Sequence, residues 1–246
     1  MTDSVVVIAG GSGGIGRAMA ERVASAERAV VVTYLRSPDP AAETVRHITD
    51  RGGRALAMSA DVADPAAVQA LLDGTLREYG RVDAVVHAVS APIHHARFEK
   101  ETWTAFEAHW SAQVRGAFNL VQTFLPELRK TRGQVIFILS SYVLHHPPVQ
   151  MAPYVTAKYA LLGLARSLGV ELIKDGVRVN MVSPYLTPTA LSSEIAPRAL
   201  EILAGAHPMR RIAATDDTAG VVDFLLSPAS GYLHLVNLPV CGGVVS

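Results

Sequence analysis

The sequence predicts one α/β domain, residues 1–246, built as a doubly wound parallel sheet with helices on both faces. Three observations support this fold class. Short apolar runs rich in Val and Ile alternate with longer amphipathic segments, the first run leads directly into a glycine-rich turn, and no repeat, linker or low-complexity segment divides the chain. Strands that alternate with helices form parallel sheets with right-handed crossovers, so we expect this topology throughout.

The expected elements follow one another in a regular order. The first run, residues 5–9, is entirely apolar, as in a strand that is covered on both faces. The predicted strands are residues 5–9, 29–35, 55–59, 82–89, 134–139, 177–182 and 233–240. The predicted helices are residues 17–26, 40–51, 65–79, 100–130 with a kink near Pro126, a helix that carries Tyr154 and Lys158 and ends near 174, and 216–226.

Composition and charge argue against several function classes. The chain is 50% hydrophobic and 18% charged with a formal net charge of zero, so nothing favours binding to nucleic acid or to an anionic membrane. The single cysteine, Cys241, excludes an intramolecular disulfide and a zinc site built from several cysteines. The apolar N-terminal run is too short for a signal peptide or a membrane span. We therefore expect a soluble cytoplasmic protein.

The segment after the first strand has the spacing of a dinucleotide-binding turn. Gly10, Gly14 and Gly16 form a Gly-x3-Gly-x-Gly pattern between a strand and a helix. Glycines allow the backbone to turn sharply and to approach a pyrophosphate, and the helix N-terminus receives its charge. The predicted phosphate-binding residues are Gly10, Ser12, Gly13, Gly14, Ile15 and Gly16. The alternative is a plain tight turn between a strand and a helix.

The end of the second strand bears on the choice of cofactor. NAD-specific sites usually place Asp or Glu there to bind the ribose diol, whereas this chain has Tyr34, Arg36 and Ser37. Arg36 and Ser37 would suit a 2′-phosphate, so NADP(H) is favoured and NAD(H) is the alternative. After the third strand, Asp61 and Val62 would contact the adenine, although Asp61 is equally placed to start a turn.

A tyrosine and a lysine four residues apart are the strongest candidates for chemistry. Tyr154 and Lys158 share one face of the expected helix, where the cation would lower the pKa of the phenol and make it a usable proton donor. Ser141 follows the fifth strand, thirteen residues before the tyrosine, and is expected to hydrogen-bond the same substrate oxygen. The alternative is that such a pair arises by chance on a solvated helix.

A proline-containing segment at about 186–210 loosens the strand and helix pattern and is expected to be a mobile lid. Substrate would enter between this lid and residues 145–151. The histidine pairs at 94–95 and 145–146 are expected to form a polar rim that contacts substrate. We expect no metal site, because no carboxylate or cysteine stands near these histidines in the sequence.

Taken together, the motifs resemble the short-chain dehydrogenase/reductase family, especially its bacterial 3-oxoacyl carrier-protein reductase type, over nearly the whole chain. The matching positions are Gly10-x3-Gly14-Ile15-Gly16, Asp61-Val62, Ser141, Tyr154-x3-Lys158, Arg178-Val179-Asn180 and the segment from Pro184 to Thr189. The resemblance implies a Rossmann-type sheet of about seven strands and a homotetramer or homodimer packed through two long helices. Trp103, Phe106 and Trp110 on the first of these would then be core or subunit interface.

The resemblance also implies roles for individual residues. Tyr154 would be the general acid, Lys158 would hold the nicotinamide ribose and lower the pKa of Tyr154, and Ser141 would orient the carbonyl. The residues expected around the nicotinamide end of the cofactor follow the fourth and sixth strands or belong to the Tyr-Lys pair. They are His87, Ala88, Val89, Tyr154, Lys158, Pro184, Tyr185, Thr187 and Thr189.

This chain departs from the family pattern at several positions. The usual Asn-Asn-Ala-Gly after the fourth strand reads His-Ala-Val-Ser at 87–90. The family's helix asparagine, which helps to hold a water that links the lysine to bulk protons, falls on Gln113. Its amide has the same donors and acceptor on a longer arm, so Gln113 would hold a displaced water or serve only in packing. Tyr185 replaces a glycine, and Cys241 replaces an aspartate before the double glycine.

The expected activity is NADP(H)-dependent reduction of a ketone, or the reverse oxidation of an alcohol. The resemblance makes a 3-oxoacyl thioester on acyl carrier protein or coenzyme A the first expected substrate, and a polyketide-like or other secondary-metabolite ketone the second. The alternative from another class is a cofactor-binding homologue with little catalysis that acts in sensing or assembly. Ketone turnover that is lost in Tyr154→Phe would eliminate this alternative.

Overall fold

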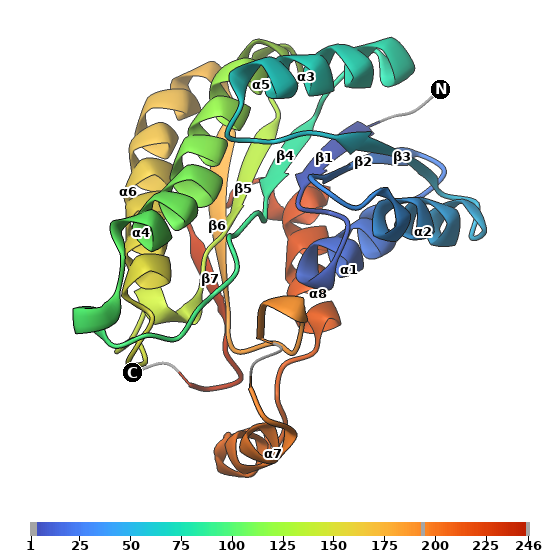
Figure 1. Cartoon of the computed structure of the whole chain (residues 1–246). Coiled ribbons are helices and arrows are strands. Elements are labelled where there is room, and N and C mark those ends of the chain that lie inside the picture. The colour runs from blue at the N-terminus through green and yellow to red at the C-terminus, as the bar shows by residue number, and fades with distance from the viewer. Residues whose placement is uncertain (1–3, 193–194, 245–246) are drawn as a thin grey trace.

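The computed structural model describes residues 4–192 and 195–244. Its centre is a seven-stranded sheet in the order β3-β2-β1-β4-β5-β6-β7, in which every pair of neighbours is parallel (Figure 1). The strands are β1 (Ser4–Ala9), β2 (Arg28–Tyr34), β3 (Arg54–Ser59), β4 (Ala84–His87), β5 (Gln134–Ile138), β6 (Arg178–Pro184) and β7 (Asn237–Val240). The doubly wound sheet predicted from the sequence is confirmed.

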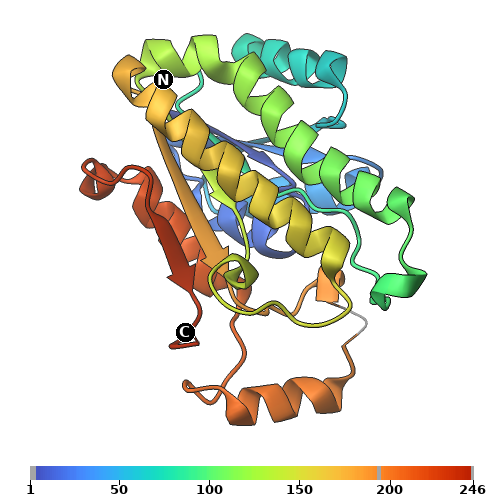
Figure 2. The same cartoon turned by 90° about the vertical axis from the view of Figure 1, so that its left-hand side faces the viewer.

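Helices cover both faces of this sheet, as Figures 1 and 2 show from two sides. One layer consists of α1 (Gly14–Val23), α2 (Pro38–Thr49) and α8 (Thr215–Leu226). The other layer consists of α3 (Pro65–Tyr79), α5 (Gly116–Thr131) and α6 (Ala152–Leu172), with the short α4 (Trp103–His109) packed on α6. The sheet is therefore buried on both faces.

Burial on both faces explains why the strands have so few polar positions. In β1, Val5 and Val7 pack into the layer of α3, α5 and α6, whereas Val6 and Ile8 pack into the layer of α1, α2 and α8. Successive side chains of a strand point to opposite faces, so a strand with two covered faces needs apolar residues at every position. The apolar run that predicted this strand is thus a consequence of the two-layer architecture.

The strand order changes direction between β1 and β4. From β1 the chain winds outward through β2 to β3, then returns to the centre at β4 and winds the other way to β7. The helices that leave the two central strands lie on opposite faces of the sheet, so a crevice opens at their carboxyl ends. Open α/β sheets bind their ligands at this point.

The long helix expected at 100–130 is divided into several helical elements. The chain forms a single 3-10 turn η1 (Phe98–Lys100), then α4, then a π-helical segment η2 (Trp110–Arg115), and then α5. Pro126 lies inside α5, and the helix continues through it to Thr131. The irregularity is therefore centred on Gln113, where π-helical turns often mark a functional site.

The segment predicted as a lid lies beyond the carboxyl ends of the strands. It contains a 3-10 turn η5 (Ala190–Ser192) and helix α7 (Pro197–Ala206), and Figure 1 shows α7 standing away from the sheet. Ser193 and Glu194 belong to the predicted lid but lie outside the described residues. Within the described ranges, no helix has both the length and the apolar character that crossing a membrane would require.

Candidate active site

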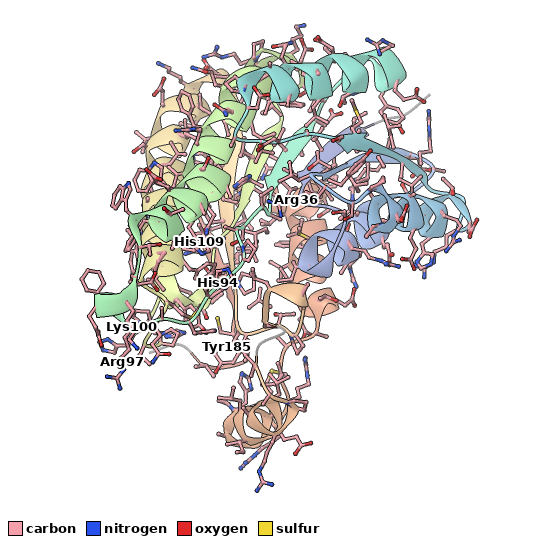
Figure 3. The ribbon with its side chains drawn as sticks, viewed as in Figure 1. Arg36, His94, Arg97, Lys100, His109 and Tyr185 are labelled. Carbon is pink, nitrogen blue, oxygen red and sulfur yellow. The ribbon has the colours of Figure 1, made fainter. Side chains whose placement is uncertain are left out.

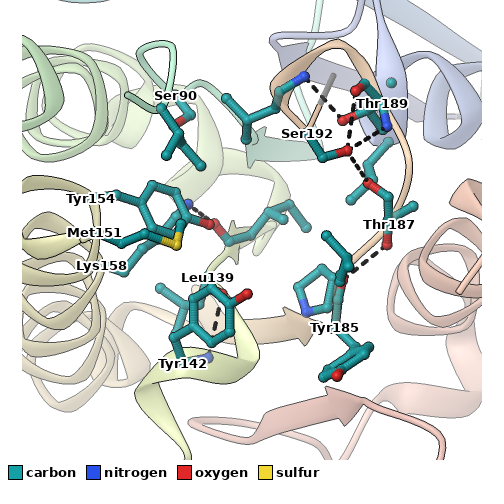
Figure 4. A pocket seen from close by; sticks show the side chains of 18 of the residues that line it. Ser90, Leu139, Tyr142, Met151, Tyr154, Lys158, Tyr185, Thr187, Thr189 and Ser192 are labelled. Atoms are coloured by element: carbon teal, nitrogen blue, oxygen red, sulfur yellow. Dashed lines mark hydrogen bonds between the residues drawn. The ribbon is translucent and has the colours of Figure 1, made fainter. Parts of the chain in front are cut away.

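A cavity of about 620 Å³ opens at the carboxyl ends of the central strands (Figure 4). Its walls come from the glycine turn before α1, the chain after β4 and β5, the start of α6, and the chain from Pro184 into the lid. Lys158 is the one charged side chain among the described residues that line it, and most of the others are apolar or aromatic. The cavity lies at the crevice where the strand order predicts a ligand.

The glycine turn forms the floor of this cavity through Gly13, Gly14 and Gly16. A Cβ on Gly16 would collide with the carbonyl oxygen of Gly10, so the helix can approach the turn only without a side chain there. Gly13 faces open space, and no side chain caps the N-terminus of α1. The first turn of α1 also has no acidic residue, so its free N–H groups suit an anion such as a pyrophosphate.

The residues predicted to choose between NADP(H) and NAD(H) do not line this cavity. Tyr34 ends β2, Arg36 and Ser37 follow it as exposed residues, and Figure 3 labels Arg36 on the side of the molecule that faces the viewer. Asp61 follows the neighbouring strand β3, and its carboxylate accepts a 2.9 Å hydrogen bond from the N–H of Ala63. The structure thus shows the turn-forming contact of Asp61 that the sequence offered as the alternative.

Helix α6 brings Tyr154 and Lys158 together at the wall of the cavity (Figure 4). The two side chains are 7% and 4% exposed, and Nζ of Lys158 lies 5.6 Å from the centre of the tyrosine ring. Nζ also donates a 2.8 Å hydrogen bond to the carbonyl oxygen of Ile138 at the end of β5. The spacing in the sequence therefore places both groups in one site.

The electrostatics of this pair differ from the expectation. Burial raises the pKa of the Tyr154 phenol to about 12, and a hydrogen bond with Ser140 only partly opposes that rise. Burial also lowers the pKa of Lys158 to about 7. The lysine does not lower the phenol pKa, because desolvation penalises the charged forms of both groups.

Ser140, and not the predicted Ser141, faces the cavity. Ser140 lines the cavity and hydrogen-bonds with Tyr154, and its Oγ accepts a 3.3 Å hydrogen bond from the N–H of Tyr142. Ser141 is 1% exposed, and its Oγ has no hydrogen-bond partner among the described residues. Ser140 is still extended, whereas Ser141 begins the 3-10 turn η3 (Ser141–Val143). A count back from Tyr154 misses this because it crosses a loop whose geometry the sequence does not fix.

Gln113 is fully buried behind the cavity and does not line it. Its Nε2 lies 3.0 Å from Nδ1 of His109 and 3.4 Å from Oγ of Ser90, which does line the cavity. The ring of His109 in turn meets the ring of Tyr154 edge-on, with 5.7 Å between centroids. The sequence interpretation missed His109, although its spacing of four residues from Gln113 is the one that paired Tyr154 with Lys158.

The segment after β4 contributes less to the cavity than predicted. Ala88 and Ser90 line it, but His87 is 1% exposed and its side chain does not line the cavity. Val89 packs against the core on the side of α5. Side chains alternate along this extended segment, so only every second residue faces the cavity. The side chains of His87 and Val89 therefore do not line the cavity.

The segment after β6 reaches the cavity as predicted. Its lining residues include Pro184, Tyr185, Thr187 and Thr189. The Thr189 methyl group would lie 3.1 Å from a Cβ on Gly14, so this segment rests on the glycine turn. Oγ of Ser192 accepts a 2.9 Å hydrogen bond from the N–H of Thr189 and donates one of 3.1 Å to the Thr187 carbonyl. These bonds stabilise the chain from Thr187 to Ser192, where the predicted lid segment meets the floor of the cavity.

The opposite rim carries aromatic and histidine side chains. Tyr142, His145 and His146 line the cavity together with Met151, and His95 reaches it from the chain after β4.

Within residues 4–192 and 195–244, no three His, Cys, Asp or Glu side chains lie close enough together to hold a metal ion. Cys241 is 3% exposed, and its thiol donates to the carbonyl oxygen of Ser183.

Comparison with known proteins assigns the family. Residues 9–245 match the family model described as enoyl-(acyl carrier protein) reductase. The 7alpha-hydroxysteroid dehydrogenase of Escherichia coli K12 is 30% identical over 240 residues, which cover 97% of this chain and 93% of the relative. The 3-oxoacyl-(acyl-carrier-protein) reductase of Staphylococcus aureus Mu50 is 28% identical over 246 residues, with coverages of 99% and 98%.

The three-dimensional comparison agrees. A short-chain dehydrogenase/reductase from Serratia marcescens superposes with a TM-score of 0.91 at 28% identity, covering all of this chain and 99% of the other. The fold, the glycine turn and the Tyr-Lys pair of the present structure are the features that the sequence had suggested. The chain belongs to the short-chain dehydrogenase/reductase family, whose members are oxidoreductases that act on CH–OH and C=O groups with a nicotinamide cofactor.

Proposed function

We propose that this protein is an NADP(H)-dependent ketone reductase, which also catalyses the reverse oxidation of the alcohol. The observation that carries the proposal is the meeting of Tyr154, Lys158 and Ser140 in one cavity whose floor is the glycine turn. A proton donor, a hydrogen-bonding hydroxyl and an anion-binding helix end then all face the same enclosed space. These are the groups that carbonyl reduction requires of the protein.

The free N–H groups at the start of α1 would bind the cofactor pyrophosphate, with Thr189 beside them. Ala88, Pro184 and Lys158 would surround the nicotinamide end. When bound, NADPH supplies the hydride that the carbonyl carbon receives. The open space above Gly13 supports this assignment, because phosphate groups can approach the backbone there without meeting a side chain.

Tyr154 acts as the general acid. Its hydroxyl donates a proton to the carbonyl oxygen while the carbon accepts the hydride, so the ketone becomes an alcohol and the tyrosine is left as a phenolate. Ser140 hydrogen-bonds with Tyr154 and donates to the same oxygen as its negative charge develops. Lys158 lies close enough to the ring to stabilise the phenolate when it is protonated.

Arg36 and Ser37 favour NADP(H) over NAD(H). Both follow β2 as exposed residues, and the chain from Tyr34 to Ser37 has no carboxylate that would bind a ribose diol. An arginine can pair with a 2′-phosphate through two parallel hydrogen bonds, whereas a carboxylate would repel it.

The lining of the cavity favours a neutral substrate with an apolar body. Ile93, Met151, Leu191 and Leu203 line it, and Lys158 is the single charged side chain among the described lining residues. A 3-oxoacyl thioester on acyl carrier protein or coenzyme A fits, since its charged carrier would remain outside. The volume of about 620 Å³ and the aromatic rim also fit a bulkier, polyketide-like ketone.

We further propose that the chain forms a homotetramer or homodimer through α4, α5 and α6. Trp103, Phe118 and Tyr159 are 73%, 48% and 46% exposed on these helices, and Val170 in the last turn of α6 and Ile173 just after it are also exposed. Large apolar side chains gathered on neighbouring helices are typical of an interface. Trp103 is therefore not a core residue, which leaves the interface as its expected role.

Stopped-flow oxidation of NADPH and NADH with acetoacetyl thioesters and with bulkier ketones tests the proposed activity. We expect NADPH oxidation that is lost in Tyr154→Phe and retained in Tyr159→Phe, a matched tyrosine on the same helix. NADPH binding without turnover of any ketone would contradict the proposal and would favour a sensing or assembly role.

A further inference from the structure

Gln113 and His109 form a buried pair that the proposed chemistry has not yet used. Gln113 is 0% exposed and His109 is 4% exposed. The amide nitrogen of Gln113 reaches Nδ1 of His109 at 3.0 Å and Oγ of Ser90 at 3.4 Å. A primary amide has two N–H hydrogens, so both of its donors are engaged.

The ring of His109 fixes the direction of this contact. Burial lowers the pKa of His109 to about 4, so the imidazole is neutral and has one N–H group. The ring also hydrogen-bonds to the backbone of Pro92, which has a carbonyl acceptor but no N–H. Nε2 therefore carries the hydrogen and donates to Pro92, while Nδ1 is left to accept from Gln113.

This arrangement fixes the orientation of the amide. If the amide of Gln113 were turned over, its oxygen would face the lone pair of Nδ1, and two acceptors would meet in a buried space. The observed orientation leaves Oε1 as an acceptor that is buried and has no partner among the described residues. An unsatisfied buried carbonyl is costly, so this oxygen is a site for a water molecule.

The proposed reaction requires a path for protons to Tyr154 and Lys158, which lie close to Gln113. Tyr154 and Lys158 are both buried, and Tyr154 must regain a proton after each reduction. Lys158 donates one of its three hydrogens to the carbonyl of Ile138, and its charge influences both His87 and His109, so these groups lie near one another. The π-helical segment that carries Gln113 packs directly against α6.

We propose that His109 is a positioning residue that holds the Gln113 amide with Oε1 presented to a water, and that this water resupplies protons to Lys158 and Tyr154. The proposal rests on the proposed reductase activity. It assigns to His109 a role that a shorter amide would not need. An asparagine in place of Gln113 would lose the reach to Nδ1 and would be independent of the histidine.

The experiment compares His109→Leu, His109→Asn and His109→Leu in a Gln113→Asn background. Leucine removes the acceptor and retains apolar volume, whereas the side-chain oxygen of asparagine can replace Nδ1. We expect His109→Leu to lower kcat by about 10-fold to 100-fold with little change in KM. We expect His109→Asn to recover most of that loss, and the leucine effect to fall below about 3-fold in the Gln113→Asn background.

His234→Leu is the matched control for the loss of a structural histidine. Its ring also makes two backbone hydrogen bonds, with Val179 and Gly169, away from the cavity. The proposal is overturned if His109→Leu lowers kcat no more than this control does. It is also overturned if His109→Asn is as impaired as the leucine variant, or if the leucine effect is equally large in both backgrounds.

A spectroscopic measurement separates this proposal from the proposed function. Nitrogen-15 NMR of the histidine rings in the cofactor-free protein should show His109 as the neutral Nε2–H form, with an Nδ1 signal that shifts in Gln113→Leu. If this signal is found but no ketone is reduced, the contact exists and the reductase assignment fails. If the reductase is active but Nδ1 carries the hydrogen, the positioning role is refuted.

Discussion

Nζ of Lys158 donates a 2.8 Å hydrogen bond to the carbonyl oxygen of Ile138, which joins α6 to the end of β5. The bond places the lysine under the cavity at the point where the fifth strand stops. Burial excludes water from this contact, and it also lowers the pKa of the ammonium from 10.5 to about 7. The lysine is thus held between its charged and neutral forms near neutral pH, and this has a measurable effect on stability.

The stability of the protein should depend on pH through Lys158. Between pH 7 and 10.5 the unfolded chain keeps a proton that the folded chain has released, so stability rises with pH in that window. The rise approaches about 1.4 kcal/mol per pH unit. Urea unfolding of the wild type and of Lys158→Met at pH 6 to 9 measures this effect. As the pH rises, the free energy of unfolding of the wild type should increase relative to that of Lys158→Met. A difference that does not vary with pH would contradict the lowered pKa.

Ser140→Ala and Ser141→Ala should separate the two serines. Ser140 faces the cavity and hydrogen-bonds with Tyr154, so its loss should lower kcat by about 10²-fold to 10³-fold. Ser141→Ala should leave kcat almost unchanged, because its Oγ is buried without a partner among the described residues. Steady-state kinetics with a reducible ketone measure both. Greater loss in Ser141→Ala would restore the assignment made from spacing.

Arg36→Ala should weaken the binding of NADPH and leave the binding of NADH almost unchanged. Removing a charged hydrogen bond to the 2′-phosphate costs about 1.5–3 kcal/mol, or roughly 10-fold to 100-fold in affinity. NADH lacks that phosphate, so its dissociation constant should stay within about 2-fold. Titration of both cofactors by fluorescence tests this. Arg46→Ala, on the exposed part of α2, provides an arginine control.

Gly16→Ala should damage the cofactor site, since its Cβ would meet the carbonyl oxygen of Gly10. Overpacking of this kind costs about 1–3 kcal/mol or more. Gly163 on α6 is the matched control, because a Cβ there meets nothing within 4 Å. Gly163→Ala should stabilise the helix by about 0.4–1 kcal/mol. Thermal unfolding and NADPH binding would show whether only Gly16→Ala loses both.

Phe118→Glu should reduce the number of subunits. Phe118 is 48% exposed on α5, and α4 and α6 also carry exposed apolar side chains. Burying an unpaired carboxylate in an interface is unfavourable, so sedimentation velocity should show a smaller species than the wild type. Phe224→Glu, an equally exposed phenylalanine on α8 at 43%, should leave the assembly unchanged. Equal behaviour of the two variants would place the interface elsewhere.

The sequence by itself determined the fold class and two parts of the site, the glycine turn and the Tyr154–Lys158 pair. The all-apolar run of β1, the glycine turn after it and the four-residue spacing of Tyr154 and Lys158 are local patterns, and each has one dominant structural interpretation. Strand and helix periodicity fix which side chains share a face, so Tyr154 and Lys158 meet whatever surrounds them. The interruption of the predicted helix lies at residues 110–115, where no proline or glycine marks it in the sequence, whereas Pro126 lies inside a helix that continues to Thr131.

Tertiary structure alone decided the contents of the site. Ser140 rather than Ser141 faces Tyr154 because the strand stays extended through Ser140 and turns at Ser141, which spacing along the sequence cannot specify. The partners of Gln113 depend on a π-helical segment that packs against another helix. The pKa values of Tyr154 and Lys158 depend on how completely the surrounding chain excludes water. Register, loop geometry and desolvation are properties of the assembled chain, whereas periodicity is a property of the sequence.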